Sequence, residues 1–476
     1  MTVRPAIVFT AALFLVWANT MRADDLIRNV HIVDVETGAA SEAKDILIGG
    51  GIIASISAPS GSAFSGGREL DGKGGYVIPG LWDSHVHVFS SADEHKTAFR
   101  LYLLNGITGI RDMGALLPLD EQKRIAAGVE AGSIMGPRII LSGAWIDASP
   151  GSWPGMFLAN TPEEGRARVK EITKQGWAAA KSYSMLGQDT FLAIADEAKK
   201  QNLPLVGHIP ESVTLETAIK AGQNGMEHFG RVTTACSTQE AAMIDRVQSA
   251  LKADDPRSAM IAEMATHNKI VLETWDLRLC NRILAEMARA NLHVTPTLIV
   301  SDFYVGKRPE ANDLKMRTLP SAVRAAWTRP DFRLEAMTDE LRALAGQSIA
   351  LDWKTFKMAH DAGVPILAAT DASFANPFIF HGFSLLDELD RYVEAGLSPR
   401  QALLTATLAP ARFFKLKSQD GPVAVGRRAD LVVLKDNPIA GLQTLRTPLA
   451  VIANGRILDR AALDDLQREL ESEAAR

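Results

Sequence analysis

This sequence of 476 residues contains few cysteines and few aromatic residues, and it has no excess of positive charge. The two cysteines, Cys236 and Cys280, permit one disulfide at most, which excludes a disulfide scaffold and a zinc cluster held by thiolates. Their pairing stays open. The chain has 51 Lys and Arg against 56 Asp and Glu, so no basic excess favours nucleic acid as a partner. With 47% hydrophobic and 22% charged residues, the composition also excludes an intrinsically disordered chain.

Long hydrophobic runs are missing too, apart from the apolar segment 6–18 that follows Arg4. This segment is shorter than the roughly 20 residues that span a bilayer, and its flanks are typical of a signal peptide. We therefore expect residues 1–23 to be a signal peptide, cleaved after Ala18 or Ala23. The mature protein would be periplasmic or secreted, with no stable membrane span. An uncleaved membrane anchor is the alternative.

The remaining sequence changes character twice. Residues 24–78 and 416–460 have short alternating patterns separated by glycines, and they predict the two parts of a small β-sandwich domain. In residues 79–415, short apolar runs alternate with helical stretches in roughly eight units, which predicts an α/β fold of the (β/α)8 TIM barrel type. Residues 461–476 are predicted to form a charged helical tail exposed to solvent. The expected barrel strands include 107–111, 138–141, 178–182, 205–208, 293–296 and 365–370.

Histidines stand at the carboxyl ends of several predicted strands. His85 and His87 are two positions apart at the end of one strand, so both imidazoles face the same side. His208 and His228 end two further apolar runs, and Asp371 ends another. Barrel enzymes carry their chemistry at this end of the strands, and a carboxylate there needs a partner that offsets its desolvation. The pattern therefore predicts a metal site.

Other polar residues near these strand ends have two interpretations each. An unpaired ammonium at Lys181 would be costly, and a structural salt bridge is one explanation for it. Tyr183 should face the same side and either donates to a developing oxyanion or packs at the rim. Asp83 either orients a ligand imidazole or bonds to a loop. His381, in the last loop, either contacts the substrate or begins a helix.

Several separated motifs lie at these strand ends: Pro79-Gly80-Leu81-Trp82-Asp83-Ser84-His85-Val86-His87, Ala180-Lys181-Ser182-Tyr183, Gly207-His208, Glu227-His228-Phe229 and Ala369-Thr370-Asp371-Ala372. In order and position they resemble the amidohydrolase superfamily, in particular its imidazolonepropionase-like, dipeptidase-type metal-dependent hydrolases. The resemblance covers nearly all of the expected mature chain.

The resemblance implies a site with two divalent metal ions, for which zinc is the expected metal. A hydroxide that bridges the metals would attack the amide carbonyl, and Asp371 would accept its proton and pass it to the leaving nitrogen. From its position two residues beyond Lys181, Tyr183 is expected to act at the carbonyl oxygen. The implied ligands are His85, His87 and Asp371 for the first ion, His208 and His228 for the second, and a carboxylated Lys181 between them.

The expected function is thus an exported binuclear amidohydrolase that cleaves a C–N amide bond in a dipeptide, an N-acyl amino acid or a cyclic amide. A homo-oligomer is compatible with the sequence. Two alternatives stay open: a mononuclear deaminase or imidazolone-type hydrolase in which Lys181 is structural, and a non-catalytic binding protein on the barrel fold. Several relatives carry a histidine in a glycine-rich stretch after the third strand, whereas residues 148–155 contain none. Dipeptide specificity is therefore not transferred to this chain.

Overall fold

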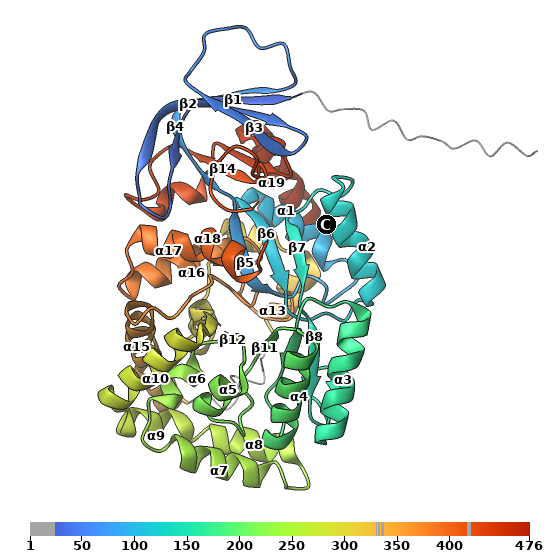
Figure 1. Ribbon diagram of the computed structural model, residues 1–476, viewed down its shortest axis with the longest axis vertical. Helices are drawn as coiled ribbons and strands as arrows, with labels where there is room; N and C mark the ends of the chain where they lie inside the picture. The colour runs from blue at the N-terminus through green and yellow to red at the C-terminus, as the bar shows by residue number, and fades with distance from the viewer. Residues whose placement is uncertain (1–23, 330, 332–333, 335–337, 417–419) are drawn as a thin grey trace, which may run out of the picture.

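The computed structural model describes residues 24–329, 331, 334, 338–416 and 420–476 (Figure 1). The predicted signal peptide at residues 1–23 lies outside this range. Within the range, every helix is too short or too polar to cross a membrane.

The amino-terminal and carboxy-terminal segments meet in one seven-stranded sheet, in the order β16-β15-β14-β4-β1-β2-β3 (Figure 1). Strand β4 joins the two segments, because it pairs in parallel with β1 and antiparallel with β14. Ile78 and Val432 pack into the core of the central region, while Val77 and Val433 pack into a core of the sheet itself. The strands are β1 (Asp25–Val33), β2 (Ala40–Gly49), β3 (Ile52–Ser57), β4 (Glu69–Pro79), β14 (Leu431–Leu434), β15 (Ala450–Ala453) and β16 (Arg456–Asp459).

The strands described for the two segments pair edge to edge in one continuous sheet, so the two segments join in one structure as predicted. The arrangement of this sheet in two facing layers, as in a β-sandwich, stays a prediction. Alternation along a strand fixes which residues share a face, but it does not determine which strands become neighbours.

The central region is built of short parallel strands in three sheets, with the orders β5-β6-β7, β11-β10-β8-β9 and β12-β13. The stretch 365–370 forms no strand and makes a single bridge from Ile366 to Val294, while Ala372 bridges to Val86 in β5. Pro365 lacks the N–H that a regular ladder would need at this point. The other five predicted strands are confirmed to within two residues. The strands are β5 (Leu81–Val86), β6 (Ile107–Asp112), β7 (Arg138–Leu141), β8 (Ala144–Asp147), β9 (Phe157–Leu158), β10 (Ala180–Ser182), β11 (Leu205–Gly207), β12 (Gly225–Glu227) and β13 (His293–Thr295).

Helices surround these strands (Figure 1). Several begin at side-chain caps: Thr161 accepts from the backbone N–H of Glu164, and Ser398 and Gln401 form a capping box. The helices are α1 (Glu94–Leu104), α2 (Leu119–Glu130), α3 (Pro162–Gln175), α4 (Gln188–Lys200), α5 (Leu215–Ala221), α6 (Gly230–Ala235), α7 (Glu240–Ala250), α8 (Pro256–Met264), α9 (His267–Thr274), α10 (Leu277–Ala290), η1 (Leu298–Val300), α11 (Ser301–Tyr304), α12 (Leu314–Arg317), α13 (Ser321–Trp327), α15 (Asp339–Asp361), α16 (Phe383–Glu394), α17 (Pro399–Thr405), α18 (Leu408–Phe413), η2 (Leu442–Arg446) and α19 (Arg460–Ala474).

The last helix, α19, differs from the solvated tail that its charge pattern predicts. Leu463, Leu466 and Leu470 are buried in one cluster with Leu101 of α1. Arg100 of α1 also pairs with a glutamate near the end of α19. The leucine spacing gives the helix an apolar stripe, and α1 covers that stripe.

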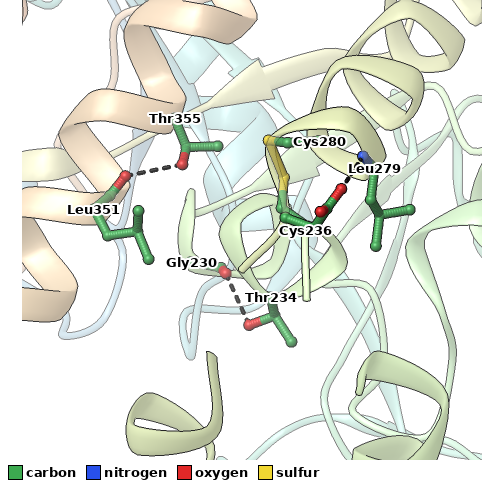
Figure 2. Close-up of a disulfide and its surroundings, with 8 residues drawn as sticks. Gly230, Thr234, Cys236, Leu279, Cys280, Leu351 and Thr355 are labelled. Carbon is green, nitrogen blue, oxygen red and sulfur yellow. Dashed lines mark hydrogen bonds between the residues drawn. A yellow bond between two sulfur atoms is a disulfide. The ribbon is translucent and has the colours of Figure 1, made fainter. Parts of the chain in front are cut away.

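Cys236 and Cys280, whose pairing the sequence leaves open, form a disulfide (Figure 2). Cys236 follows α6 directly, and Cys280 lies in the first turns of α10, which Asp276 caps at the backbone N–H of Leu279. Both cysteines are fully buried. The bond ties α10 to the helix that follows His228.

Candidate metal centre

Four imidazoles, a lysine and a carboxylate meet at the carboxyl ends of the parallel strands. They line one cavity of about 280 Å³. All six residues that the sequence suggests as ligands take part: His85, His87, Lys181, His208, His228 and Asp371.

Two of these residues have unusual backbone conformations. His228 and Asp371 both have φ of 63°, the left-handed region that non-glycine residues seldom adopt. Strained residues of this kind cluster at functional sites, where the surrounding structure holds them in place. His228 follows β12, and Asp371 ends the stretch that bridges to β13 and β5.

The ring nitrogen Nδ1 of three of the four imidazoles forms a hydrogen bond with the protein, and that of His85 lies close to a carboxylate without forming one. An imidazole held through Nδ1 keeps Nε2 for a metal, and its orientation is fixed by the other partner. The Nδ1 contacts are His87 to the Gly114 carbonyl at 2.9 Å, His208 to Ser184 Oγ at 3.0 Å, His228 to Thr297 Oγ1 at 2.8 Å and His85 to Glu227 Oε2 at 2.9 Å.

Asp371 stands between the imidazoles. Its Oδ1 lies 3.1 Å from His87 Nε2 and 3.3 Å from His85 Nε2, and Asn376 Nδ2 donates to its Oδ2 at 3.0 Å. Burial alone would raise the pKa of Asp371, but the hydrogen bond from His87 and the neighbouring imidazoles lower it well below its usual value. Asp371 is therefore ionised at neutral pH.

The donor set fits a divalent metal. Potential ligand atoms of His85, His228 and Asp371 all lie within 4.8 Å of one another. Burial lowers the pKa of His85, His208 and His228 below the usual value for histidine, so these rings are neutral, the form that binds metals. Imidazole and carboxylate ligands suit zinc and several other divalent ions.

Lys181 is 1% exposed, and its Nζ donates to the Met113 carbonyl at 2.8 Å. The ammonium also lies 5.5 Å from the centre of the Trp145 ring and 5.6 Å from that of Tyr183. Burial lowers the pKa of Lys181 to about 8, although the charges of nearby acids oppose the shift. The structure thus gives it a carbonyl and two aromatic faces in place of the salt bridge considered from the sequence.

Two residues that matter for the site, Glu227 and Arg111, were missed by the sequence reasoning. Arg111 Nη2 donates to both carboxylate oxygens of Glu227 at 2.9 Å, and Glu227 in turn lies against His85. Thr295 Oγ1 also donates to Glu227. The available signal was an acid at the end of β12 and an arginine inside β6, since a buried charge of either sign needs a partner.

The expected substrate role of His381 is corrected. This side chain is 1% exposed and does not line the cavity. Its Nδ1 lies 2.8 Å from Tyr102 Oη and its Nε2 lies 2.9 Å from Glu94 Oε1. Since both ring nitrogens are engaged by residues of α1, His381 anchors α16 to α1 and has no nitrogen left for a ligand.

Asp83 forms hydrogen bonds to a loop residue, which is the second of the two interpretations of this side chain. Its Oδ2 accepts from Thr370 Oγ1 at 2.7 Å, and its Oδ1 accepts from the Thr370 backbone N–H at 3.1 Å. Burial raises the pKa of Asp83 to about 7, although these hydrogen bonds oppose the shift. Asp83 thereby ties β5 to the residue before Asp371.

Aromatic side chains form one wall of the cavity. Tyr183 lines it and stacks on His208, with ring centres 4.0 Å apart. Trp153 Nε1 donates to Tyr183 Oη at 2.8 Å, although the Trp153 residue is 45% exposed. Trp153 belongs to the segment 148–155, which has no histidine, and Trp145 and Tyr304 complete the wall. Burial raises the pKa of Tyr183, so the phenol stays protonated and able to donate.

Comparison with known proteins identifies the family. The profile of the amidohydrolase family matches residues 76–458, most of the chain. The chain belongs to the amidohydrolase family. This amidohydrolase is 21% identical over 436 residues to the ochratoxinase of Aspergillus niger, covering 79% of the chain and 73% of that relative.

Solved structures agree with this assignment at the level of the fold. Bottromycin amidohydrolase has a TM-score of 0.71 at 23% identity, with 94% of this chain and 90% of that chain covered. A Xaa-Pro dipeptidase with bound methionine in its active site has a TM-score of 0.63 at 20% identity, with 92% and 100% covered. The family neighbours imply a (β/α)8 barrel for the central region. This amidohydrolase is a hydrolase that acts on carbon–nitrogen bonds.

Proposed function

We propose that this amidohydrolase is an exported, binuclear metal-dependent enzyme that hydrolyses the amide bond of a dipeptide, an N-acyl amino acid or a cyclic amide. The observation that carries the proposal is the convergence of four imidazoles, Asp371 and Lys181 on one cavity. These residues would hold the two divalent ions, with zinc as the expected metal. When bound, such ions would lower the pKa of water and polarise the scissile carbonyl.

The protein's own groups then have defined tasks. Asp371 is ionised and held by Asn376, so its carboxylate accepts the proton of the attacking water. It returns that proton to the leaving nitrogen, so that one water and one amide give one acid and one amine. Tyr183 keeps its phenolic proton and donates to the carbonyl oxygen as negative charge develops there.

Lys181 would act in carboxylated form. Its lowered pKa of about 8 leaves part of the amine neutral, and the neutral amine adds to carbon dioxide with loss of one proton. The product is a carbamate, which has two oxygen ligands and a negative charge. This conversion replaces a buried cation with an anion beside the imidazoles.

Replacing Lys181 with alanine should reduce the metal content from two ions per chain to one or fewer, because the bridging ligand is lost. Elemental analysis after purification with zinc and bicarbonate checks this. Tyr183→Phe is the matched control, because it changes a neighbouring residue that is no ligand, and it should retain both ions. A wild-type protein that holds only one ion under these conditions would refute the binuclear proposal.

A mononuclear deaminase or imidazolone-type hydrolase is the second candidate. One observation favours it: His85, His228 and Asp371 alone already bring ligand atoms within 4.8 Å of one another. Such an enzyme would be fully active with one ion per chain, and Lys181→Ala would then leave the metal content unchanged. The same elemental analysis therefore separates the two candidates.

The aromatic wall favours substrates with a flat, bulky acyl group. Lys181 is the one cationic side chain among the described residues that line the cavity, whereas Trp145, Trp153, Tyr183 and Tyr304 offer aromatic surface. We expect N-benzoyl amino acids to be hydrolysed with a kcat/KM about tenfold above that of N-acetyl amino acids, because ring contacts add to the buried area. Initial rates over a matched acyl series measure this. Trp153→Ala should remove most of the preference; a preference unaltered in that variant would contradict the assignment.

Export is the remaining part of the proposal. It is supported by Arg4 and the apolar segment 6–18, and by the Cys236–Cys280 disulfide, since disulfides persist in oxidising compartments. Mass spectrometry of protein expressed in a secretion-competent host should give a mature chain that begins near Asn19 or Asp24. A full-length chain in the cytosol would overturn this part alone.

A further inference from the structure

A second cavity, of about 380 Å³, adjoins the candidate metal centre. His208 and His228 line both cavities, and the wall of the second one continues along α6, α9 and α15. Its size is within the range of small-molecule sites, which is roughly 300–1,000 Å³. A substrate that places its carbonyl at these two imidazoles can therefore extend into the second cavity.

The charged side chains of this second wall are mostly acidic, and we call it the acidic cavity. Glu211, Glu227 and Asp352 line it, whereas Arg231 is the one arginine or lysine among the described residues that does. Burial lowers the pKa of each histidine in the wall, so these rings carry no positive charge at neutral pH. Glu227 is already paired with Arg111. The charge balance therefore depends on the other two acids and Arg231.

Arg231 does not neutralise both acids. Its Nη1 lies 3.8 Å from Glu211 Oε2, which is beyond hydrogen-bond distance. Its Nη2 lies 3.9 Å from Glu240 Oε1 and donates to the Val213 carbonyl at 2.6 Å. Glu240 does not line the cavity. One guanidinium is thus shared between an acid of the wall and an acid outside it.

The carboxylates of Asp352 and Glu211 are left with spare capacity. Burial raises the pKa of Asp352 to about 6, the nearby Thr233 hydroxyl opposes the shift, and no cation among the described residues contributes. Glu211 is 8% exposed, and Arg231 is the one charged partner that the described residues give its carboxylate. The oxygens of both carboxylates are open to the cavity, whereas Arg231 Nε is enclosed. A largely buried carboxylate without a partner is costly, so this wall is suited to a cation that the chain does not supply.

We propose that the acidic cavity is the subsite for a positively charged side chain on the amine half of the substrate, a guanidinium or an ammonium group. This subsite serves the amide hydrolysis proposed above, on which its role in substrate choice rests. With the substrate carbonyl at His208 and His228, the acyl group contacts the aromatic wall and the charged side chain enters the acidic cavity. There the cation donates charge-assisted hydrogen bonds to Glu211 and Asp352. N-acyl derivatives of arginine and lysine have this chemistry.

Isothermal titration of the zinc-loaded mature protein with L-arginine and with L-citrulline tests the subsite without any turnover. The two amino acids have nearly the same shape, but the ureido group of citrulline is neutral. L-Arginine should bind at least about tenfold more tightly, because only its guanidinium forms charge-assisted hydrogen bonds with the two carboxylates.

Replacing Asp352 with asparagine should weaken arginine binding at least about fivefold and leave citrulline binding unchanged. Glu211→Gln should have the same effect from a different element of the fold. Asp361→Asn is the matched control: it makes the same change in α15, in an acid that pairs with Lys357 and lines neither cavity. This control should bind both amino acids as the wild type does. Thermal unfolding of the variants verifies that they fold.

Hydrolysis is measured separately, with Nα-benzoyl-L-arginine and Nα-benzoyl-L-citrulline. The arginine derivative should have a kcat/KM at least about tenfold higher, for the same reason. Selective binding of arginine without hydrolysis of either amide would contradict hydrolysis of N-acyl amino acids and leave the subsite standing. The subsite is overturned if the wild type binds arginine no more tightly than citrulline, or if Asp352→Asn and Glu211→Gln keep the full preference.

Discussion

Replacing Asp371 with asparagine should lower turnover by about 10²- to 10⁴-fold, the usual contribution of general acid–base catalysis, while most of the bound metal remains. The asparagine amide keeps the shape of the side chain and an oxygen that can coordinate weakly. It cannot accept a proton from water or return one to the leaving nitrogen. The four imidazoles remain in place to bind metal, and hydrogen bonds at Nδ1 hold three of them.

The comparison requires equal metal content in the two proteins, because a variant without metal is inactive for a trivial reason. Asp83→Asn is the matched control: it makes the same chemical change in a buried acid that contacts Thr370 and does not line the cavity. Its effect on turnover should be much smaller. If a fully loaded Asp371→Asn enzyme kept near-wild-type kcat on an identified amide, another group would have to transfer the proton.

Five of the six candidate ligands could be found from the sequence because each depends on a local rule, whereas Lys181 is a candidate ligand only through the family resemblance. His85 and His87 share a face through the two-residue period of a strand, and His208, His228 and Asp371 each end an apolar run. Parallel strands place their carboxyl ends together, so residues that are far apart in the chain meet without any knowledge of their contacts. The structure brings them to one cavity for that reason.

Residues that depend on long-range pairing could not be placed in this way. Nothing near Arg111 in the sequence identifies Glu227 as its partner, because the pair joins β6 to β12 across the interior of the central region. The position of His381 in a loop gave no information on its direction, and both ring nitrogens turned out to be engaged by α1. That the two terminal segments join was predicted, whereas the order of the strands in their sheet was not, since strand order is not a local property.

The pair between Arg111 and Glu227 provides the largest expected effect on stability. Both side chains are buried, with exposures of 1% and 0%, and two contacts of 2.9 Å join them. Arg111→Met removes the cation and leaves the Glu227 carboxylate without its partner beside His85. We expect a loss of about 3–5 kcal/mol in the free energy of unfolding, as found when one member of a buried ion pair is removed.

Urea unfolding of the metal-free proteins measures this loss, because bound metal would add its own stabilisation to the folded state. Arg124→Met is the matched control, since Arg124 pairs with Glu121 on the surface, with exposures of 66% and 39%. Arg124→Met should lower the free energy of unfolding by less than about 1 kcal/mol. The double variant Arg111→Met/Glu227→Met, which removes both charges, should be more stable than Arg111→Met alone, because no unpaired carboxylate remains.

The same pair should also affect metal binding. Glu227 lies 2.9 Å from the Nδ1 of His85, and loss of a carboxylate that orients a ligand imidazole costs about 10- to 100-fold in metal affinity. The double variant should therefore regain stability relative to Arg111→Met while still binding metal more weakly than the wild type. If Arg111→Met lowers the free energy of unfolding by no more than Arg124→Met does, the buried pair is not a source of stability. If the double variant binds metal as tightly as the wild type, Glu227 does not orient His85.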